Sequence, residues 1–133
     1  MAKINQILSD QEKGVEEKRA EFQTILASAI SNVQKAIEID DKNYQNFAML
    51  GRVYGSVVPL GVEGAYESAK RAYDEAIKLN PHNPEVFLTL AKLELARDAN
   101  NIVGAEEFIG KALEKKNNYT EAIFLLSQLQ IQT

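Results

Sequence analysis

The chain repeats one pattern of small and apolar residues three times, and this repeat limits the fold more than any other feature of the sequence. Each copy has an alanine, a larger apolar residue four positions later and a second alanine three positions after that. The copies are Ala29, Val33 and Ala36; Ala69, Tyr73 and Ala76; and Ala105, Ile109 and Ala112. Spacings of three and four place such residues on one face of a helix, where alanine lets another helix approach closely. The repeat therefore predicts stacked helix pairs.

A second pattern follows each copy of the first. It reads Phe47, Leu50, Gly51 and Tyr54, then Phe87, Leu90, Ala91 and Glu94, and more faintly Ile123, Leu126, Ser127 and Gln130. Phe47 and Phe87 are 40 residues apart, and Phe87 and Ile123 are 36 residues apart. We expect the difference between these two periods to lie in turns, since an insertion inside a packed helix would rotate its apolar face away from the core.

Together, the two patterns resemble the signature of the tetratricopeptide repeat (TPR) family, which is W-x2-L-G-x2-Y, then A-x3-F, then a proline. The resemblance reaches from Ala29 to Gln130, and residues 44–81 carry the best copy, which ends at Pro81. The departures are Phe or Ile in place of Trp, Glu94 in place of an aromatic residue, and Asp41 and Asn117 in place of the proline. The resemblance implies an all-α fold, a right-handed superhelical stack of antiparallel helix pairs (a TPR α-solenoid).

Periodicity and helix-ending residues predict helices over residues 16–39, 43–55, 63–79, 84–97, 102–115 and 119–131. We interpret the short apolar piece Ile4, Ile7 and Leu8 as the end of an earlier helix, because Ser9, Asp10 and Gly14 follow it. A single array over 1–133 then comprises a partial first repeat (1–41), a repeat with an enlarged inter-helix loop at 56–63 (42–81), a repeat (82–117), and the first helix of a truncated repeat (118–133).

The enlarged loop contains the apolar run Val57, Val58, Pro59 and Leu60, followed by Gly61 and Gly64. Proline disfavours helix on its N-terminal side, and the two glycines loosen the chain. We predict that the apolar run packs against adjacent helices. The alternative is that it contacts a partner.

Composition excludes several kinds of chemistry. The chain has no Cys and one histidine, His82, so thiolate nucleophiles and Cys-based zinc sites are excluded. His82 lies in an Asn-Pro-His-Asn-Pro turn with no second histidine in the chain, which favours a turn residue over a catalytic base. The acidic pairs Glu16-Glu17, Asp40-Asp41 and Glu106-Glu107 are adjacent in sequence, which favours solvated faces over metal sites. We expect no enzymatic activity, cofactor or metal.

Charge and hydropathy point to the same class of protein. The formal net charge is −4, from 15 Lys and Arg against 19 Asp and Glu, and no basic stripe suited to nucleic acid is present. No apolar run approaches the roughly 20 residues that span a bilayer. We therefore expect no nucleic-acid partner, no direct membrane insertion and a cytoplasmic location.

The TPR resemblance implies that the first helix of each pair lines a concave groove that receives segments of partner proteins. By position, the groove-lining residues are Gln45, Ala48, Arg52, Glu85, Leu88, Lys92, Glu121, Phe124 and Gln128. One row of this set is apolar and consists of Ala48, Leu88 and Phe124. The next row is basic or polar and consists of Arg52, Lys92 and Gln128. This pairing would suit a protein or peptide segment that carries an apolar anchor beside an acidic residue.

The last predicted helix has apolar residues around much of its circumference, although stacked repeats need polar outer faces at their ends. We therefore expect a piece of a longer array, with possible self-association through this C-terminal edge. The sequence predicts a non-enzymatic protein-interaction scaffold. The alternative is a spacer or regulatory soluble part of a larger enzyme or membrane-anchored protein, and a stand-alone enzyme is a more distant third.

Overall fold

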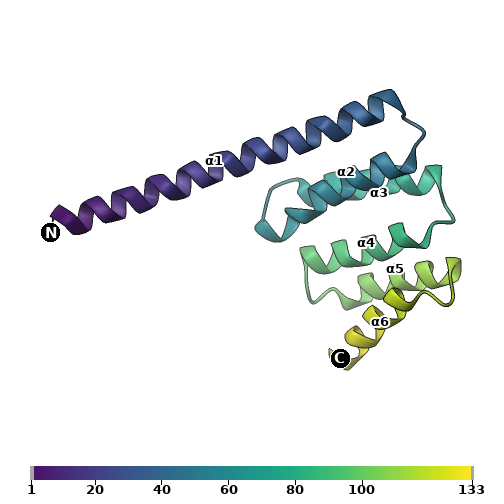
Figure 1. Cartoon of the computed structure of the whole chain (residues 1–133). Coiled ribbons are helices and arrows are strands. Elements are labelled where there is room, and N and C mark those ends of the chain that lie inside the picture. The colour runs from purple at the N-terminus through teal and green to yellow at the C-terminus, as the bar shows by residue number, and fades with distance from the viewer. Residues whose placement is uncertain (1, 133) are drawn as a thin grey trace. The chain divides into compact units, whose positions relative to one another are not determined.

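A computed structural model describes residues 2–132, apart from the side chains of residues 2–5, 7, 8 and 13. Every regular element in this part of the chain is helical, and no strand occurs in it. The all-α prediction is therefore confirmed. The elements are α1 (Ala2–Ile39), α2 (Tyr44–Ser56), the 3-10 turn η1 (Val58–Leu60), α3 (Ala65–Leu79), α4 (Pro84–Arg97), α5 (Ile102–Lys115) and α6 (Thr120–Gln132) (Figure 1).

Helix α1 corrects one prediction. It begins at Ala2 instead of near residue 16, and it passes through Gly14 without a break. The expected separate helix end at residues 4–8 is therefore wrong, although the side chains of Ile4, Ile7 and Leu8 lie outside the described residues. The physical reason is that one glycine costs a helix interior only about 1 kcal/mol, and the residues on both sides are good helix formers.

The chain divides into two compact units, residues 1–32 and residues 33–133. The first unit is a single stretch of helix. The apolar stripe predicted for it is present, yet Phe22 and Ile25 are exposed and Leu26, Ala29 and Ile30 are only half-buried. No described side chain of this unit is fully buried.

The second unit consists of helices that each run back along the preceding one from α2 to α6 (Figure 1). Helix α2 packs along α3, and α4 packs along α5, while α3 meets α4 and α5 meets α6. Four-residue turns that begin with the same backbone hydrogen bond lie at 40–43, 80–83 and 116–119. In each, the first N–H donates to the carbonyl of the pattern's second alanine: Asp40 to Ala36 (3.0 Å), Asn80 to Ala76 (2.9 Å) and Lys116 to Ala112 (3.0 Å).

The core of the second unit contains the small residues that the sequence pattern singles out. Ala69, Ala76, Ala105 and Ala112 are completely buried, which confirms the close helix packing predicted for them. Around them lie two hydrophobic clusters, one centred on α3 and α4 and the other joining α4, α5 and α6. Helix α4 contributes to both clusters and is therefore the central helix of this unit.

At Gly51 the backbone of α2 lies directly against the Tyr73 side chain of α3. A Cβ atom at this position would lie 2.6 Å from the ring of Tyr73, which is itself buried. Glycine is thus required because the aromatic ring of one helix packs directly against the backbone of the other. The sequence pattern predicts this close packing.

Residues 57–64 connect α2 to α3 and contain the 3-10 turn η1. Val57 is buried and Val58 packs against the core, as predicted, whereas Leu60 remains exposed. Gly61 and Gly64 adopt φ values of 76° and 79°, a left-handed conformation that residues with a Cβ rarely adopt.

The crowding at Gly51 yields a stability prediction with an internal control. We expect Gly51→Ala to lower the free energy of unfolding by about 1–2 kcal/mol, because overpacking outweighs the gain in helix propensity. A Cβ atom at Gly110, in α5, would have no neighbour within 4 Å beyond its own helix backbone, so Gly110→Ala should raise stability by up to about 1 kcal/mol. Urea unfolding followed by circular dichroism measures both effects, and stabilisation by both substitutions would contradict the packing described here.

Candidate functional site

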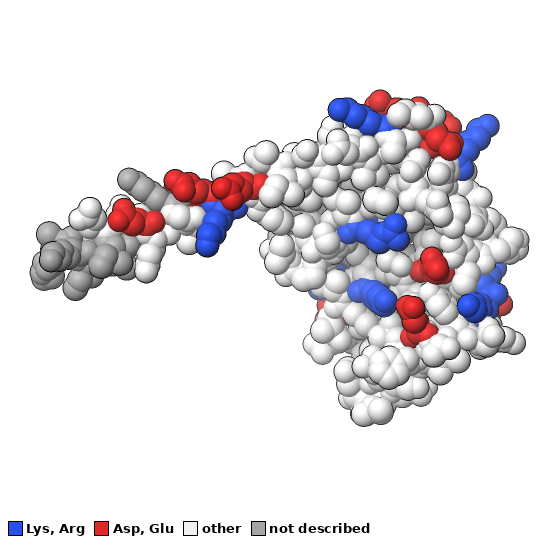
Figure 2. All heavy atoms as spheres, viewed as in Figure 1, with Lys and Arg blue, Asp and Glu red and all other residues white. Residues whose placement is uncertain are grey.

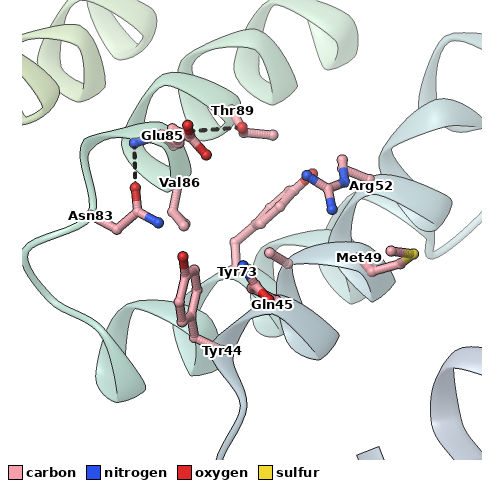
Figure 3. A pocket seen from close by; sticks show the side chains of 10 residues that line it. Tyr44, Gln45, Met49, Arg52, Tyr73, Asn83, Glu85, Val86 and Thr89 are labelled. Carbon is pink, nitrogen blue, oxygen red and sulfur yellow. Dashed lines mark hydrogen bonds between the residues drawn. The ribbon is translucent and has the colours of Figure 1, made fainter. Parts of the chain in front are cut away.

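A hollow lies between the facing sides of α2 and α4, and Figure 3 shows the side chains around it. Its floor is apolar and nearly closed to solvent, because Ala48, Tyr73 and Val86 are buried. Polar side chains from both helices form the rim. The lining residues are Tyr44, Gln45, Ala48, Met49, Arg52, Tyr73, Asn83, Glu85, Val86 and Thr89.

Helices α2 and α4 both begin beside this hollow, and each has an asparagine as its N-cap. The Asn43 side-chain oxygen accepts a hydrogen bond from the backbone N–H of Gln45 at 3.0 Å, and that of Asn83 accepts one from Glu85 at 2.9 Å. Such caps satisfy backbone donors that a helix cannot satisfy internally. The repeated cap therefore sets Gln45 and Glu85 at equivalent places on the rim.

Tyr73 is the one lining residue that comes from a second helix of a pair, α3. Its ring passes over Gly51 and rises between α2 and α4, with Arg52 at its tip (Figure 3). Burial raises the pKa of the Tyr73 hydroxyl to about 12, and the positive charge of Arg52 acts against this shift. The phenol is therefore neutral at physiological pH.

A second hollow continues from the first along the same helices. The two share Arg52, Tyr73 and Thr89, and the second adds Gly55, Lys92, Leu93 and Ala96. We call the two hollows together the α2–α4 groove. The described residues around the second hollow include two cations, Arg52 and Lys92, and no carboxylate, whereas Glu85 lines the first hollow. The groove therefore has a mixed end and a basic end.

The structure brings together five of the nine residues that the sequence places in a groove. Gln45, Ala48, Arg52 and Glu85 line the first hollow, and Lys92 lines the second. The prediction that Leu88 lines the groove is wrong. Leu88 is buried in the cluster that joins α4, α5 and α6, so its side chain is not accessible to a ligand. Glu121, Phe124 and Gln128 are exposed on α6 and line neither hollow.

Sequence reasoning missed several residues of the groove. The repeat pattern predicts only a packing role for Tyr73, and its place in the floor follows from the lack of a side chain at Gly51, over which the ring packs. The residues predicted on α4 are Glu85, Leu88 and Lys92. Asn83 lies before them and Val86 lies between the first two, so the spacing of three and four residues does not identify either one. The other residues missed in the first hollow are Tyr44, Met49 and Thr89.

A polar cluster surrounds the buried side chain of Glu94, the residue that departs from the repeat signature. Its carboxylate accepts hydrogen bonds from the hydroxyl of Tyr66, from Nη2 of Arg97 at 2.9 Å and from Nδ2 of Asn101 at 3.0 Å. The Arg97 guanidinium also lies 4.0 Å from the centre of the Tyr66 ring. Every group has a partner within the protein, and Asn101 caps α5 by accepting from the N–H of Gly104. This cluster holds α3, α4 and α5 together and leaves no group directed at a substrate.

Other candidate sites are sparse in the described part of the chain. His82 lies exposed in the turn between α3 and α4, as predicted for a turn residue. No group of three or more metal-ligating side chains occurs among the described residues. None of the described helices combines the length and the apolar character needed to cross a membrane. On the face that Figure 2 shows, basic and acidic side chains are interspersed.

The chain matches no protein-family model, and no curated protein matches it either.

The Glu94 cluster leads to a stability prediction. Glu94→Ala removes the shared acceptor of three donors, and we expect it to cost about 3 kcal/mol of unfolding free energy. The matched control is Glu75→Ala, which breaks an ion pair to Lys78 of the same 2.9 Å length and sequence spacing but on an exposed surface. This control should cost less than about 1 kcal/mol. Equal losses in urea unfolding would show that the cluster contributes no more than a surface pair.

The buried phenol of Tyr73 and the half-buried phenol of Tyr66 lead to a prediction on alkaline pH. Burial raises the pKa of Tyr66 to about 12, with further contributions from the hydrogen bond and negative charge of Glu94, and burial raises the pKa of Tyr73 to a similar value. Because both values exceed the ordinary 10.0, folding favours the neutral phenols. Their contribution to stability is complete below about pH 10 and is lost as the pH rises towards 12.

We therefore expect the melting temperature to fall across this window and the fall to be smaller in Tyr73→Phe. The chain has five tyrosines, so the difference in tyrosinate absorbance between the unaltered chain and Tyr73→Phe measures the ionisation of Tyr73. Ionisation of Tyr73 with an ordinary phenol pKa would contradict its burial in the groove floor.

Proposed function

We propose that this chain is a TPR-type helical stack that acts, without enzymatic activity, as a scaffold for protein–protein interaction. In this proposal the α2–α4 groove receives a segment of a partner protein. The observation that carries the proposal is the groove itself, which combines a buried apolar floor with a basic end at Arg52 and Lys92.

The repetition of local structure supports the stack. The turns at 40–43, 80–83 and 116–119 begin with the same backbone hydrogen bond, and the alanines of α3 and α5 are buried at matching positions. In such a stack the first helices of successive pairs face a common groove. The hollows lie between α2 and α4, which are first helices in the proposed arrangement.

The chemistry of the groove supports a particular kind of segment. An apolar side chain of the bound segment can contact the floor formed by Ala48, Tyr73 and Val86. A carboxylate of the same segment would then lie near Arg52 and Lys92. The two cations are exposed, so each attraction contributes on the order of 1 kcal/mol and weakens with salt. We therefore expect weak, salt-sensitive binding of acidic segments that carry an apolar anchor.

The polar groups of the groove favour binding over catalysis. The Thr89 hydroxyl donates to the Glu85 carbonyl oxygen at 2.9 Å, an ordinary bond within α4 that does not activate it as a nucleophile. Glu85 and Arg52 are exposed on the rim, where solvent screens them. This arrangement can recognise a segment, but it offers no positioned pair of nucleophile and base.

Charge reversal in the groove tests the proposal. We expect Arg52→Glu combined with Lys92→Glu to abolish detectable capture of a labelled peptide rich in Asp and Glu with a single Leu anchor. At minimum the dissociation constant should rise about 10-fold or more, because repulsion replaces two attractions. Both residues are exposed, so the melting temperature should stay unchanged. Fluorescence anisotropy at low and high salt measures the binding.

The matched control reverses two cations outside the groove, Lys35→Glu with Arg71→Glu, and gives the same change in net charge. This variant should bind the peptide nearly as well as the unaltered chain. Equal loss in both double variants would show that net charge, and not the groove, attracts the peptide. Undiminished capture by the groove variant would overturn the proposal and favour the spacer function.

A further inference from the structure

Helix α4 is covered by other helices on two sides. It lies between α2 and α3 on one side and α5 and α6 on the other, and its residues Phe87, Leu88 and Ala91 are 8%, 3% and 0% exposed. These three positions face the helices that follow α4 in the chain, since they share a cluster with α5 and α6. The same positions in another first helix should be equally buried wherever following helices cover them.

Helix α6 has the same positions without the cover. Thirty-six residues after Phe87, Leu88 and Ala91 come Ile123, Phe124 and Ser127. Ile123 is 44% exposed, Phe124 is 64% exposed and Ser127 is exposed as well. The opposite side of α6 is packed normally, since Ala122 and Leu129 are buried against α4 and α5. The apolar face formed by Ile123 and Phe124 is therefore open.

Helix α1 carries the complementary feature. Forty residues separate Ile25, Ala29 and Val33 from Ala65, Ala69 and Tyr73 of α3, a helix that packs against α2 and α4. The α3 residues are 2%, 0% and 2% exposed, whereas Ile25 is 68% exposed and Ala29 and Val33 are half-buried. Helix α1 therefore has the pattern of a second helix of a pair, with the face for its first helix open.

We infer that the open face of α6 binds the open face of α1 from a second copy of this chain. The packing of α2 on α3 and of α4 on α5 supplies the precedent: a first helix with large apolar residues covers a second helix with alanine in the same register. The α6 of one copy and the α1 of the next would form one more such pair. The inference rests on these helix pairs and does not depend on peptide binding in the α2–α4 groove.

This contact joins two different surfaces, so it is heterologous and does not close on itself in a dimer. Each added copy presents a fresh α6 face, and assembly therefore proceeds to higher oligomers as the concentration rises. A two-fold contact of α6 with α6 would instead stop at a dimer. The size of the assembly thus distinguishes the two occupants.

Two single variants of the full chain test the pairing. Phe124→Glu places a charge on the α6 face, and Ile25→Glu places one on the α1 face; both residues are exposed, so circular dichroism should show unchanged helix content. Sedimentation velocity of the unaltered chain at high micromolar concentration should show concentration-dependent oligomers. Each variant should raise the dissociation constant about 10-fold or more. The control Val103→Glu, at a 71% exposed apolar position of α5, should leave assembly unchanged.

Mixing the two variants gives the decisive measurement. Phe124→Glu retains an intact α1 face and Ile25→Glu retains an intact α6 face, so the mixture should form a 1:1 dimer that grows no further. An unaltered chain that stays monomeric at high micromolar concentration would overturn the inference. Loss of assembly in Phe124→Glu alone, without rescue on mixing, would identify an α6–α6 contact instead. Loss in Ile25→Glu alone would identify an α1–α1 contact, and either result rejects the proposed occupant.

Discussion

The contact between the Tyr73 ring and the backbone at Gly51 determines both the packing of the second unit and its groove. It sets how closely α2 lies against α3, because any side chain at residue 51 would meet the ring. It also brings the ring into the space between α2 and α4, where it forms the groove floor. The same interaction thus joins a helix pair and shapes the surface that we propose for binding. A substitution at either residue would act on both.

Sequence patterns predicted the helices of the second unit well, because their ends are encoded locally. Asn43 and Asn83 are caps, Pro84 occupies a first helical turn, and the turn residues recur with the repeat. The bounds of α2 to α6 accordingly fall within two residues of those predicted. The sequence pattern does not predict the continuity of α1, because Gly14 is of a residue type that often ends a helix. In the middle of good helix formers, its cost is too small to end the helix.

The groove was harder to predict than the helices. Helical spacing identifies which residues share a side of α4, but it does not say which neighbouring helix covers each of them. Leu88 lies under α5 and α6, whereas Lys92, one turn later on the same side, remains exposed. Tyr73 belongs to another helix altogether, and only the three-dimensional approach over Gly51 places it in the floor. A cap or a turn can be predicted from the local sequence. Burial by segments that are distant in the sequence cannot be predicted in this way.

The loop that connects the two helices of a pair differs between α2–α3 and α4–α5. This difference determines where the chain can change in length. Residues 98–101, between α4 and α5, are held by the polar cluster at Glu94 through Asn101. Residues 57–64, between α2 and α3, are twice as many, and Leu60, Gly61 and Gly64 are exposed there. Doubling a loop costs only about 0.6 kcal/mol of closure entropy. The α2–α3 loop is therefore the natural position for inserting a tag, a reporter or a second binding segment while both helix pairs keep their packing.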